Sequence, residues 1–339
     1  MGRALALSTQ RKDGSFSTMA SNMNFYTRLH GFTERVLTFR KRRRLKQKLK
    51  QQSKHWLRDW LEAILWAICM VLLINQYLFQ MYRIPSGSMS GTLEIGDMIF
   101  VNKLVYGPEL LPGLGKLSGF REAERGEIVV FENPAYIGKG PVFTILQQFV
   151  YMATLTMVDI DRDEYGQPRV HYLIKRAVAV GGDTVRVTDG NLYFRFRGSD
   201  TWVSELDYQN ESGFQYPVRR MVSPEEYPAI HEAGRRAALA DLGLPVPPGA
   251  SQVNLYDEIA FSSSRLEELA AAYPHDARLR GEARKMAAGW YIPDGRVFTL
   301  GDNRDNSKDA RWFGAVSLKR VLGHALFIYW PLNRVGRIR

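Results

Sequence analysis

Cysteine is almost absent from this chain of 339 residues. The single cysteine, Cys69, lies inside an apolar segment, so neither an internal disulfide nor a zinc site built from cysteines can form. Common catalytic patterns are missing as well: a His-Glu-x-x-His zinc motif, a Gly-x-Ser-x-Gly elbow around Ser86 or Ser88, and a phosphate-binding Gly-rich loop. The sequence therefore gives no support to a zinc protease, an α/β-hydrolase triad or a nucleotide-binding loop.

Acidic residues are absent from Arg40–Arg58, which contains ten Lys or Arg residues and accounts for most of the formal net charge of +11. The remainder of the chain is near neutral, which weakens an interpretation as a general nucleic-acid binder. An anchored protein that binds nucleic acid through the basic run alone stays open as an alternative.

Formal charge is also missing from Ala63–Tyr82, and twenty such residues suit a bilayer core of roughly 30 Å when helical. Trp and Tyr residues stand near both ends, as they do at membrane interfaces. A buried core helix is the alternative, but the basic flank favours a span with a cytoplasmic N-terminus. We expect a basic cytoplasmic segment over 1–58 and one transmembrane helix over 59–82. Everything after Arg83 is expected on the periplasmic or extracytoplasmic side of the inner membrane.

Beyond Arg83 the pattern predicts a mainly β fold. Short β-branched and aromatic runs bounded by Gly or Pro predict strands, and alternation about Asp189-Gly190 predicts a hairpin. The predicted strands are Asp97–Val101, Glu127–Phe131, the two arms of Asp183–Phe196, Val297–Leu300 and Ala325–Trp330. We expect residues 83–197 and 291–339 to form one β core.

Two stretches interrupt this β pattern. Val142–Val158 is apolar and aromatic, and we expect a core helix or a surface helix lying on the membrane rather than a second span. Residues 198–290 are expected to form a partly helical insertion. Its helices are predicted over Glu225–Leu242 and Ser262–Ala288, with a proline-rich break at Pro245–Pro248.

Three stretches carry the residues that could perform chemistry. Arg83–Lys103 holds two serines either side of Gly87, directly after the apolar segment. Lys175 lies in an apolar run beside Arg176, and both features lower the pKa of a lysine toward the neutral form that a general base needs. Gly301–Gly314 packs charges of alternating sign into one loop, and such charges form hydrogen bonds that fix backbone shape. A solvated turn or a calcium loop is the alternative there, although the EF-hand spacing is absent.

Taken together and in this order, the stretches resemble the bacterial type I signal peptidases, also called leader peptidases, which are membrane-anchored serine–lysine endopeptidases. The similar segments are Pro85–Met89 for the nucleophile box, Arg125–Phe131 for a strand box, Lys175–Val178 with Gly182-Asp183 for the general-base box, and Gly301–Asp309 with Arg311 and Gly314 for the final box. The resemblance implies a signal-peptidase-like antiparallel β-sheet catalytic core with a helical insertion, anchored by one N-terminal transmembrane helix.

The resemblance implies a role for each matched polar residue. Ser88 would be the nucleophile and Lys175 the general base. The Ser86 hydroxyl and the Ser88 backbone N–H would form the oxyanion hole, and Ser307 would hydrogen-bond Lys175 and orient it.

The resemblance also implies supporting and specificity-determining residues. Asp309 and Arg311 would brace the final loop. Shallow pockets that select Ala-x-Ala-like cleavage sites would be lined by four apolar residues, namely Ile84, Met89, Leu93 and Ile174.

The implied substrates are exported preproteins, whose signal peptides would be removed, and the lipid bilayer is an implied partner. The export translocon is a further candidate, while no nucleic acid, metal or cofactor is expected. The chain departs from the family pattern at Gly91 and Gly181, where proline is usual, and at Ala310, where serine is frequent. None of these is a catalytic position, so we expect an active enzyme. An inactive scaffold that binds preproteins through the insertion is the alternative.

Overall fold

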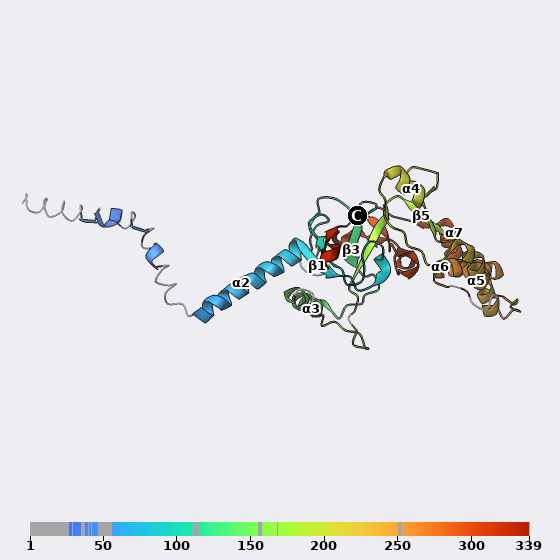
Figure 1. The fold of residues 1–339 in the computed structure, drawn as a ribbon, viewed down its shortest axis with the longest axis horizontal. Coiled ribbons are helices and arrows are strands. Elements are labelled where there is room, and N and C mark those ends of the chain that lie inside the picture. The colour runs from blue at the N-terminus through green and yellow to red at the C-terminus, as the bar shows by residue number, and fades with distance from the viewer. Residues whose placement is uncertain are drawn as a thin grey trace, which may run out of the picture. The chain divides into compact units, whose positions relative to one another are not determined.

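The computed structural model describes residues 27–28, 30–34, 38–39, 41, 43–46, 56–110, 115–154, 158–167, 169–249, 253 and 255–338. Most of the predicted basic segment 1–58 therefore lies outside the described residues. The chain divides into two compact units, Met1–Ala67 and Ile68–Arg339. Helix α2 begins in the first unit and ends in the second (Figure 1).

Helix α2, Trp56–Tyr77, is the one helix of the described chain that is long and apolar enough to cross a membrane. Its apolar stretch, Arg58–Tyr77, has a mean hydropathy of 1.5, and only 6% of the most apolar window is buried. That exposure removes the buried-core alternative for this helix, because a core helix hides its apolar side chains.

The predicted helix boundary at Tyr82 is wrong. The helix ends at Tyr77, and Phe79–Arg83 forms strand β1, which pairs residue for residue with β2, Met98–Asn102. Gln80 and Tyr82 point into the protein while their neighbours are more exposed, the alternation of a half-buried strand. The absence of charge over Ala63–Tyr82 predicted one continuous helix. Charge alone does not distinguish the last helical turn from the strand that follows it.

The larger sheet runs in the order β1-β2-β11-β3-β4-β9-β10, with β12 paired to β11, and all its pairs are antiparallel. Its further strands are β3 (Ile128–Glu132), β4 (Tyr172–Val180), β9 (Arg296–Leu300), β10 (Val316–Ser317), β11 (Val321–Trp330) and β12 (Gly336–Arg337). These elements confirm the predicted mainly β, antiparallel core and each strand predicted for it. One face of the sheet covers an apolar cluster that includes Ile84, Met89 and Leu93.

A smaller sheet holds four strands in the order β7-β6-β5-β8. They are β5 (Thr184–Thr188), β6 (Asn191–Arg195), β7 (Val203–Ser204) and β8 (Trp290–Tyr291). The predicted hairpin is confirmed: Asp189 and Gly190 connect β5 to β6 with φ of 47° and 66°. Two positive φ values in a two-residue turn match the twist of the paired strands.

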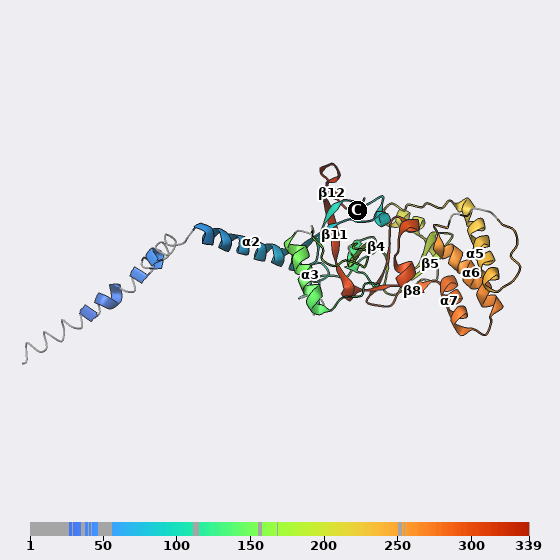
Figure 2. The same ribbon diagram turned by 90° about the horizontal axis from the view of Figure 1, so that it is seen from below.

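The insertion between β6 and β8 contains four helices in its described part. They are α4 (Glu205–Ser212), α5 (Tyr227–Asp241), α6 (Glu258–Ala272) and α7 (Ala277–Ala288). Both views show α5, α6 and α7 gathered beside β5 (Figures 1 and 2). The predicted single helix over Ser262–Ala288 is wrong, because Pro274 follows the end of α6 and the Asp276 carboxylate caps a new helix. The predicted domain boundaries stay a prediction.

Helix α3, Pro141–Ala153, occupies the apolar stretch between β3 and β4. Its outward stripe is Val142, Ile145, Leu146 and Phe149, which are 41–79% exposed. Gln147, on the other face, is buried. The core-helix expectation is therefore wrong, since a core helix would bury this stripe and expose its glutamine. Helix α3 is a surface helix, and its contact with the membrane stays a prediction.

Candidate active site

The turn that carries the two serines follows β1 directly. Gly87–Met89 forms a single turn of 3-10 helix, and Ser88 and Met89 are buried. The turn is closed by hydrogen bonds from the Ser90 amide to the Gly87 carbonyl at 3.1 Å and from the Leu93 amide to the Met89 carbonyl at 2.8 Å. Ser88 is therefore held on a fixed backbone rather than on a loose linker.

Lys175 reaches this turn from the middle of β4. Its Nζ lies 2.6 Å from Ser88 Oγ, across a separation of 87 residues, and Lys175 is 3% exposed. Burial lowers the pKa of Lys175 to about 8, with smaller opposing effects from Asp309 and Asp302. A buried amine in contact with a serine hydroxyl, with its charged form disfavoured, has the geometry of a general base and its nucleophile.

The Ser88 amide and the Ser86 hydroxyl belong to the same turn as the Ser88 hydroxyl. Ser88 is the second residue of its 3-10 turn, and amides in the first turn of a helix have no partner within that helix. Ser86 caps the same turn, its side chain makes no capping hydrogen bond, and the residue is exposed to the cleft described below. Their role as an oxyanion hole stays a prediction.

The loop after β9 is tied to β4 and to the nucleophile turn by a buried ion pair. Arg176 donates to the Asp302 carboxylate from Nε at 2.8 Å and from Nη2 at 2.7 Å. Thr92 donates to the same carboxylate at 2.5 Å. Asp302 is fully buried, so the loop is fixed at its first charged residue.

A second ion pair fixes the other end of that loop. Arg311 donates to Asp309 from Nε at 2.9 Å and from Nη2 at 3.0 Å, and the Gly301 amide donates to Asp309 at 3.1 Å. Arg311 also donates to the Arg304 carbonyl. These contacts are what a bracing pair requires.

Ser307 lies close to Ser88 across Gly301, but it does not hydrogen-bond Lys175 as predicted. A Cβ on Gly301 would fall 2.3 Å from Ser307 Oγ and 2.4 Å from the Ser88 carbonyl oxygen, so only glycine fits between them. The Ser307 hydroxyl is buried and makes no hydrogen bond within the described chain. The predicted hydrogen bond from Ser307 to Lys175 is thus not formed in this structure, where Lys175 bonds to Ser88 instead.

A cleft of about 820 Å³ opens beside Ser88 and Lys175. Ser86, Ser88 and Lys175 line it, together with three of the predicted pocket residues, Ile84, Met89 and Ile174. Leu93 does not line the cleft. Leu93 is fully buried in the apolar cluster beneath the cleft, because its backbone amide donates to the Met89 carbonyl and this turn directs the side chain inward. The prediction that Leu93 lines a substrate pocket is therefore wrong.

One wall of the cleft is an open strand edge. β4 pairs with β3 from Tyr172 to Arg176, but its other edge pairs with β9 only from Arg176 to Val180. No strand in the described ranges pairs with that second edge between Tyr172 and Lys175. Unpaired backbone groups at such an edge bind an extended peptide as an added strand.

The replacement of the family's proline has a structural reason at Gly91. Its φ is +105°, and a Cβ there would lie 3.3 Å from Pro217 of the insertion. Proline is fixed near −65°, so this turn excludes it. Glycine at position 91 thus allows the turn after Met89 to lie against Pro217 of the insertion.

A serine–histidine–aspartate set, separate from Ser88 and Lys175, is formed by two residues of the insertion and one residue of the β5–β6 turn. His231 bonds Ser264 Oγ at 2.6 Å and Asp189 Oδ1 at 2.7 Å. Ser264 is 9% exposed in the middle of α6, packed on Gly234 of α5, where a substrate carbonyl has no access. The set joins α5 and α6 to the β5–β6 turn. Across the described ranges, no group of three or more His, Cys, Asp or Glu could hold a metal ion.

Sequence reasoning missed the insertion residues that touch the final loop. Glu205 of α4 accepts two hydrogen bonds from Arg304, each at 2.6 Å, and Tyr216 donates to the same carboxylate at 2.6 Å. All three side chains are buried. The available signal was the density of charged residues in Gly301–Gly314, but the sequence does not say which of them pair outside the loop.

The chain is also similar to known proteins. The family model described as "Signal peptidase, peptidase S26" matches residues 57–330. Signal peptidase I of Haemophilus influenzae is 27% identical over 271 residues, covering 79% of this chain and 68% of the relative. Signal peptidase I of Aquifex aeolicus is 29% identical over 272 residues, covering 78% and 80%. A solved signal peptidase I from Enterococcus faecalis V583 is 19% identical, and the match covers 60% of this chain and 97% of that one. The TM-score of this match is 0.23.

Proposed function

This chain belongs to the signal peptidase family, peptidase S26, and on that premise we propose that Ser88 and Lys175 form the catalytic dyad with which it removes signal peptides from exported preproteins. The observation that carries the proposal is the buried 2.6 Å contact between Lys175 Nζ and Ser88 Oγ. It also disfavours an inactive scaffold, which has no need of a buried lysine beside a serine.

The reaction follows from the positions of these groups. Neutral Lys175 takes the Ser88 proton as Oγ attacks the scissile carbonyl carbon, and the resulting ammonium then gives a proton to the leaving amine. The Ser88 amide and the Ser86 hydroxyl stabilise the oxyanion of the tetrahedral intermediate. A water molecule, activated by Lys175 in the same way, hydrolyses the Ser88 ester.

Substrate selection follows from the cleft. A preprotein binds in extended form along the free edge of β4, facing the segment Ile84–Ser86. Ile84, Met89 and Ile174 leave shallow space for side chains near the scissile bond. Small residues fit there and larger ones clash, which supports Ala-x-Ala-like cleavage sites.

The membrane is the second partner in this proposal. Helix α2 anchors the chain in the inner membrane with its N-terminus in the cytoplasm, as the basic flank and the single apolar span support. The apolar stripe of α3 contacts the surface of the same bilayer, since an exposed stripe at helical spacing suits a lipid interface. Anchoring places enzyme and signal peptide in one surface and raises their effective concentration.

The test uses the purified full chain in detergent with a preprotein that carries an Ala-x-Ala site. We expect one cut after the second alanine, and no cut by the Ser88→Ala or Lys175→Ala variants, with unchanged circular dichroism. A preprotein whose alanine before the cut is replaced by phenylalanine is the matched substrate control. Full cleavage by either variant would show that the dyad is misassigned.

A further inference from the structure

The final loop lies between the nucleophile turn and the insertion. On one side, Asn303 donates from its amide to the Ser88 carbonyl at 3.1 Å and from Nδ2 to the Gly87 carbonyl at 3.0 Å. On the other side, the backbone amide of Arg219 in the insertion donates to the Asp302 carbonyl at 2.8 Å. The Arg219 carbonyl accepts from the Arg304 amide at 3.0 Å. Residues 302–304 thus connect residue 219 to the backbone of Ser88 by hydrogen bonds. A displacement of residues 219–222 is therefore expected to displace Ser88.

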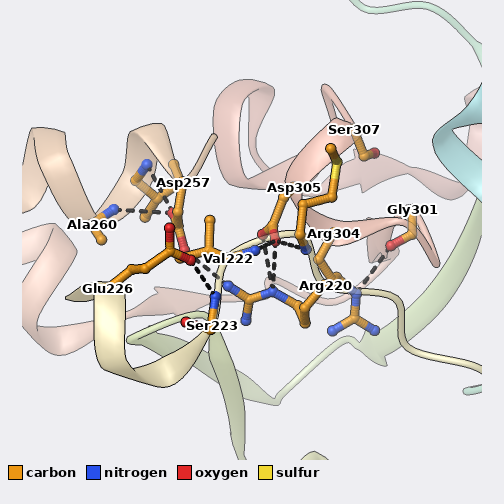
Figure 3. Close-up of polar contacts among 12 residues, drawn as sticks. Arg220, Val222, Ser223, Glu226, Asp257, Ala260, Gly301, Arg304, Asp305 and Ser307 are labelled. Carbon is orange, nitrogen blue, oxygen red and sulfur yellow. Dashed lines mark hydrogen bonds and ion pairs between the residues drawn. The ribbon is translucent and has the colours of Figure 1, made fainter. Parts of the chain in front are cut away.

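Asp305 attaches this loop to the insertion at a second point, besides the ion pair between Arg304 and Glu205. Its carboxylate is fully buried and accepts from the Met221 amide at 2.6 Å, the Val222 amide at 3.0 Å and Arg220 Nε at 2.9 Å. Figure 3 shows Asp305 facing Arg220, with Ser307 farther along the same loop. All of these partners of the Asp305 carboxylate come from residues 220–222.

Arg220 connects Asp305 to the helices. Its Nη2 lies 3.2 Å from Asp257 Oδ2 and donates to the Tyr227 hydroxyl at the start of α5. Asp257 is 3% exposed and caps α6 by accepting from the Ile259 and Ala260 amides, each at 3.1 Å. One guanidinium therefore bridges two buried carboxylates, one on the catalytic side and one on the helix pair (Figure 3).

We propose that Arg220 is a positioning residue for the peptidase reaction, and that the α5–α6 pair thereby holds the loop that shapes the site around Ser88 and Lys175. The proposal rests on the proposed function. Arg220 touches neither substrate nor the reacting atoms. It acts by fixing Asp305, and through Asp305 the backbone of Asn303 and Ser307. Gly190 leaves room for it, because a Cβ there would lie 1.7 Å from the guanidinium nitrogens.

The bridging geometry makes arginine the required cation. Its fork presents donors to both carboxylates at once, whereas the single ammonium of lysine reaches one at a time. Without the cation, Asp257 and Asp305 become two buried like charges, and the loop moves away. A displacement of about 1 Å at a reacting group costs up to about 100-fold in rate.

The experiment compares Arg220→Met and Arg220→Lys with wild type, using the full chain in detergent and an Ala-x-Ala preprotein. We expect Arg220→Met to lower kcat about 10- to 100-fold with KM within about twofold, and Arg220→Lys to fall between. The acidic limb of the pH–rate profile should also move to higher pH. A displaced loop admits water to Lys175 and raises the pKa of its amine, a change that loss of stability alone does not produce.

The matched control is Arg265→Met, which breaks an exposed ion pair with Asp241 in the same insertion, away from the final loop. It should leave kcat and the pH profile unchanged. Wild-type kcat in both Arg220 variants would overturn the proposal, as would an equal loss in the control. If Arg220→Met does not fold, Arg220→Lys decides: a lower kcat with a shifted limb supports the role, and a wild-type profile refutes it. An inactive wild-type chain would instead refute the proposed function.

Discussion

The dependence of the reaction on pH tests the assignment of Lys175 most directly. An amine whose pKa is about 8 is neutral in about one molecule in ten at pH 7, whereas one at its ordinary 10.5 is neutral in about one in 3000. Burial of Lys175 thus makes about 300 times more of the active form available at pH 7. Because the neutral amine is the base, the rate should rise with pH and level off above the pKa.

The expected profile has a definite shape. Between pH 6 and pH 9, kcat/KM should increase about 90-fold, with a limb of unit slope and a midpoint near pH 8. The assay follows cleavage of an Ala-x-Ala preprotein in detergent-containing buffers of constant ionic strength. The preprotein has no titratable side chain near its cleavage site, so that only the enzyme titrates.

The chain offers a matched control for this measurement. Burial also lowers the pKa of Lys116 to about 8, but its Nζ donates to the carbonyls of Leu318 at 3.2 Å and Val321 at 2.5 Å rather than to a serine. Lys116→Met should keep the limb, and Lys175→Met should abolish activity at every pH. A flat profile from pH 7 to 9, a midpoint near 10.5, or loss of the limb in Lys116→Met would refute the reasoning.

Three further predictions concern other parts of the site. Ser86→Ala should lower kcat about 100- to 1000-fold with little change in KM, and an unchanged kcat would remove Ser86 from the oxyanion hole. Ile174→Ala should widen the cleft and raise cleavage of a Val-x-Ala site relative to Ala-x-Ala about tenfold; an unchanged ratio in competition assays would exclude Ile174 from the pocket. In a Cys69→Ser background, a fluorophore at Phe149→Cys should be quenched by brominated lipid in proteoliposomes, while one at Tyr273→Cys on the insertion should not. Equal quenching at both positions, or none at Phe149, would contradict contact of α3 with the bilayer.

The strands and the pairing of Ser88 with Lys175 could be predicted from sequence because each depends on local pattern or on a motif. Period-two alternation marks Thr184–Arg195, and the turn chemistry of Asp189-Gly190 fixes its register. Ser88 and Lys175 were identified through the resemblance of their flanking residues, and the structure places them in contact.

The errors have physical causes that no local pattern records. Hydropathy is the same for the last turn of α2 and for β1, so only the pairing with β2 separates them. Leu93 was assigned to the pocket by position, but the backbone turn directs it into the core. Arg220 and Glu205 carry no motif, because their partners lie 85 and 99 residues away. Contacts at such separation are visible only in the fold.

The ion pair between Arg176 and Asp302 has a consequence for the timing of synthesis. Arg176 is buried beside the catalytic lysine, yet its carboxylate partner is made 126 residues later. Until then, closing the core around Arg176 would strand a buried charge at a cost of about 3–5 kcal/mol. We therefore expect that a growing chain which already contains Ser88 and Lys175 does not bring them together until Asp302 has been made. A chain ending at Leu300 is expected to cut nothing, and cleavage by such a chain would contradict this. On this expectation, the order of the sequence itself delays the assembly of Ser88 with Lys175.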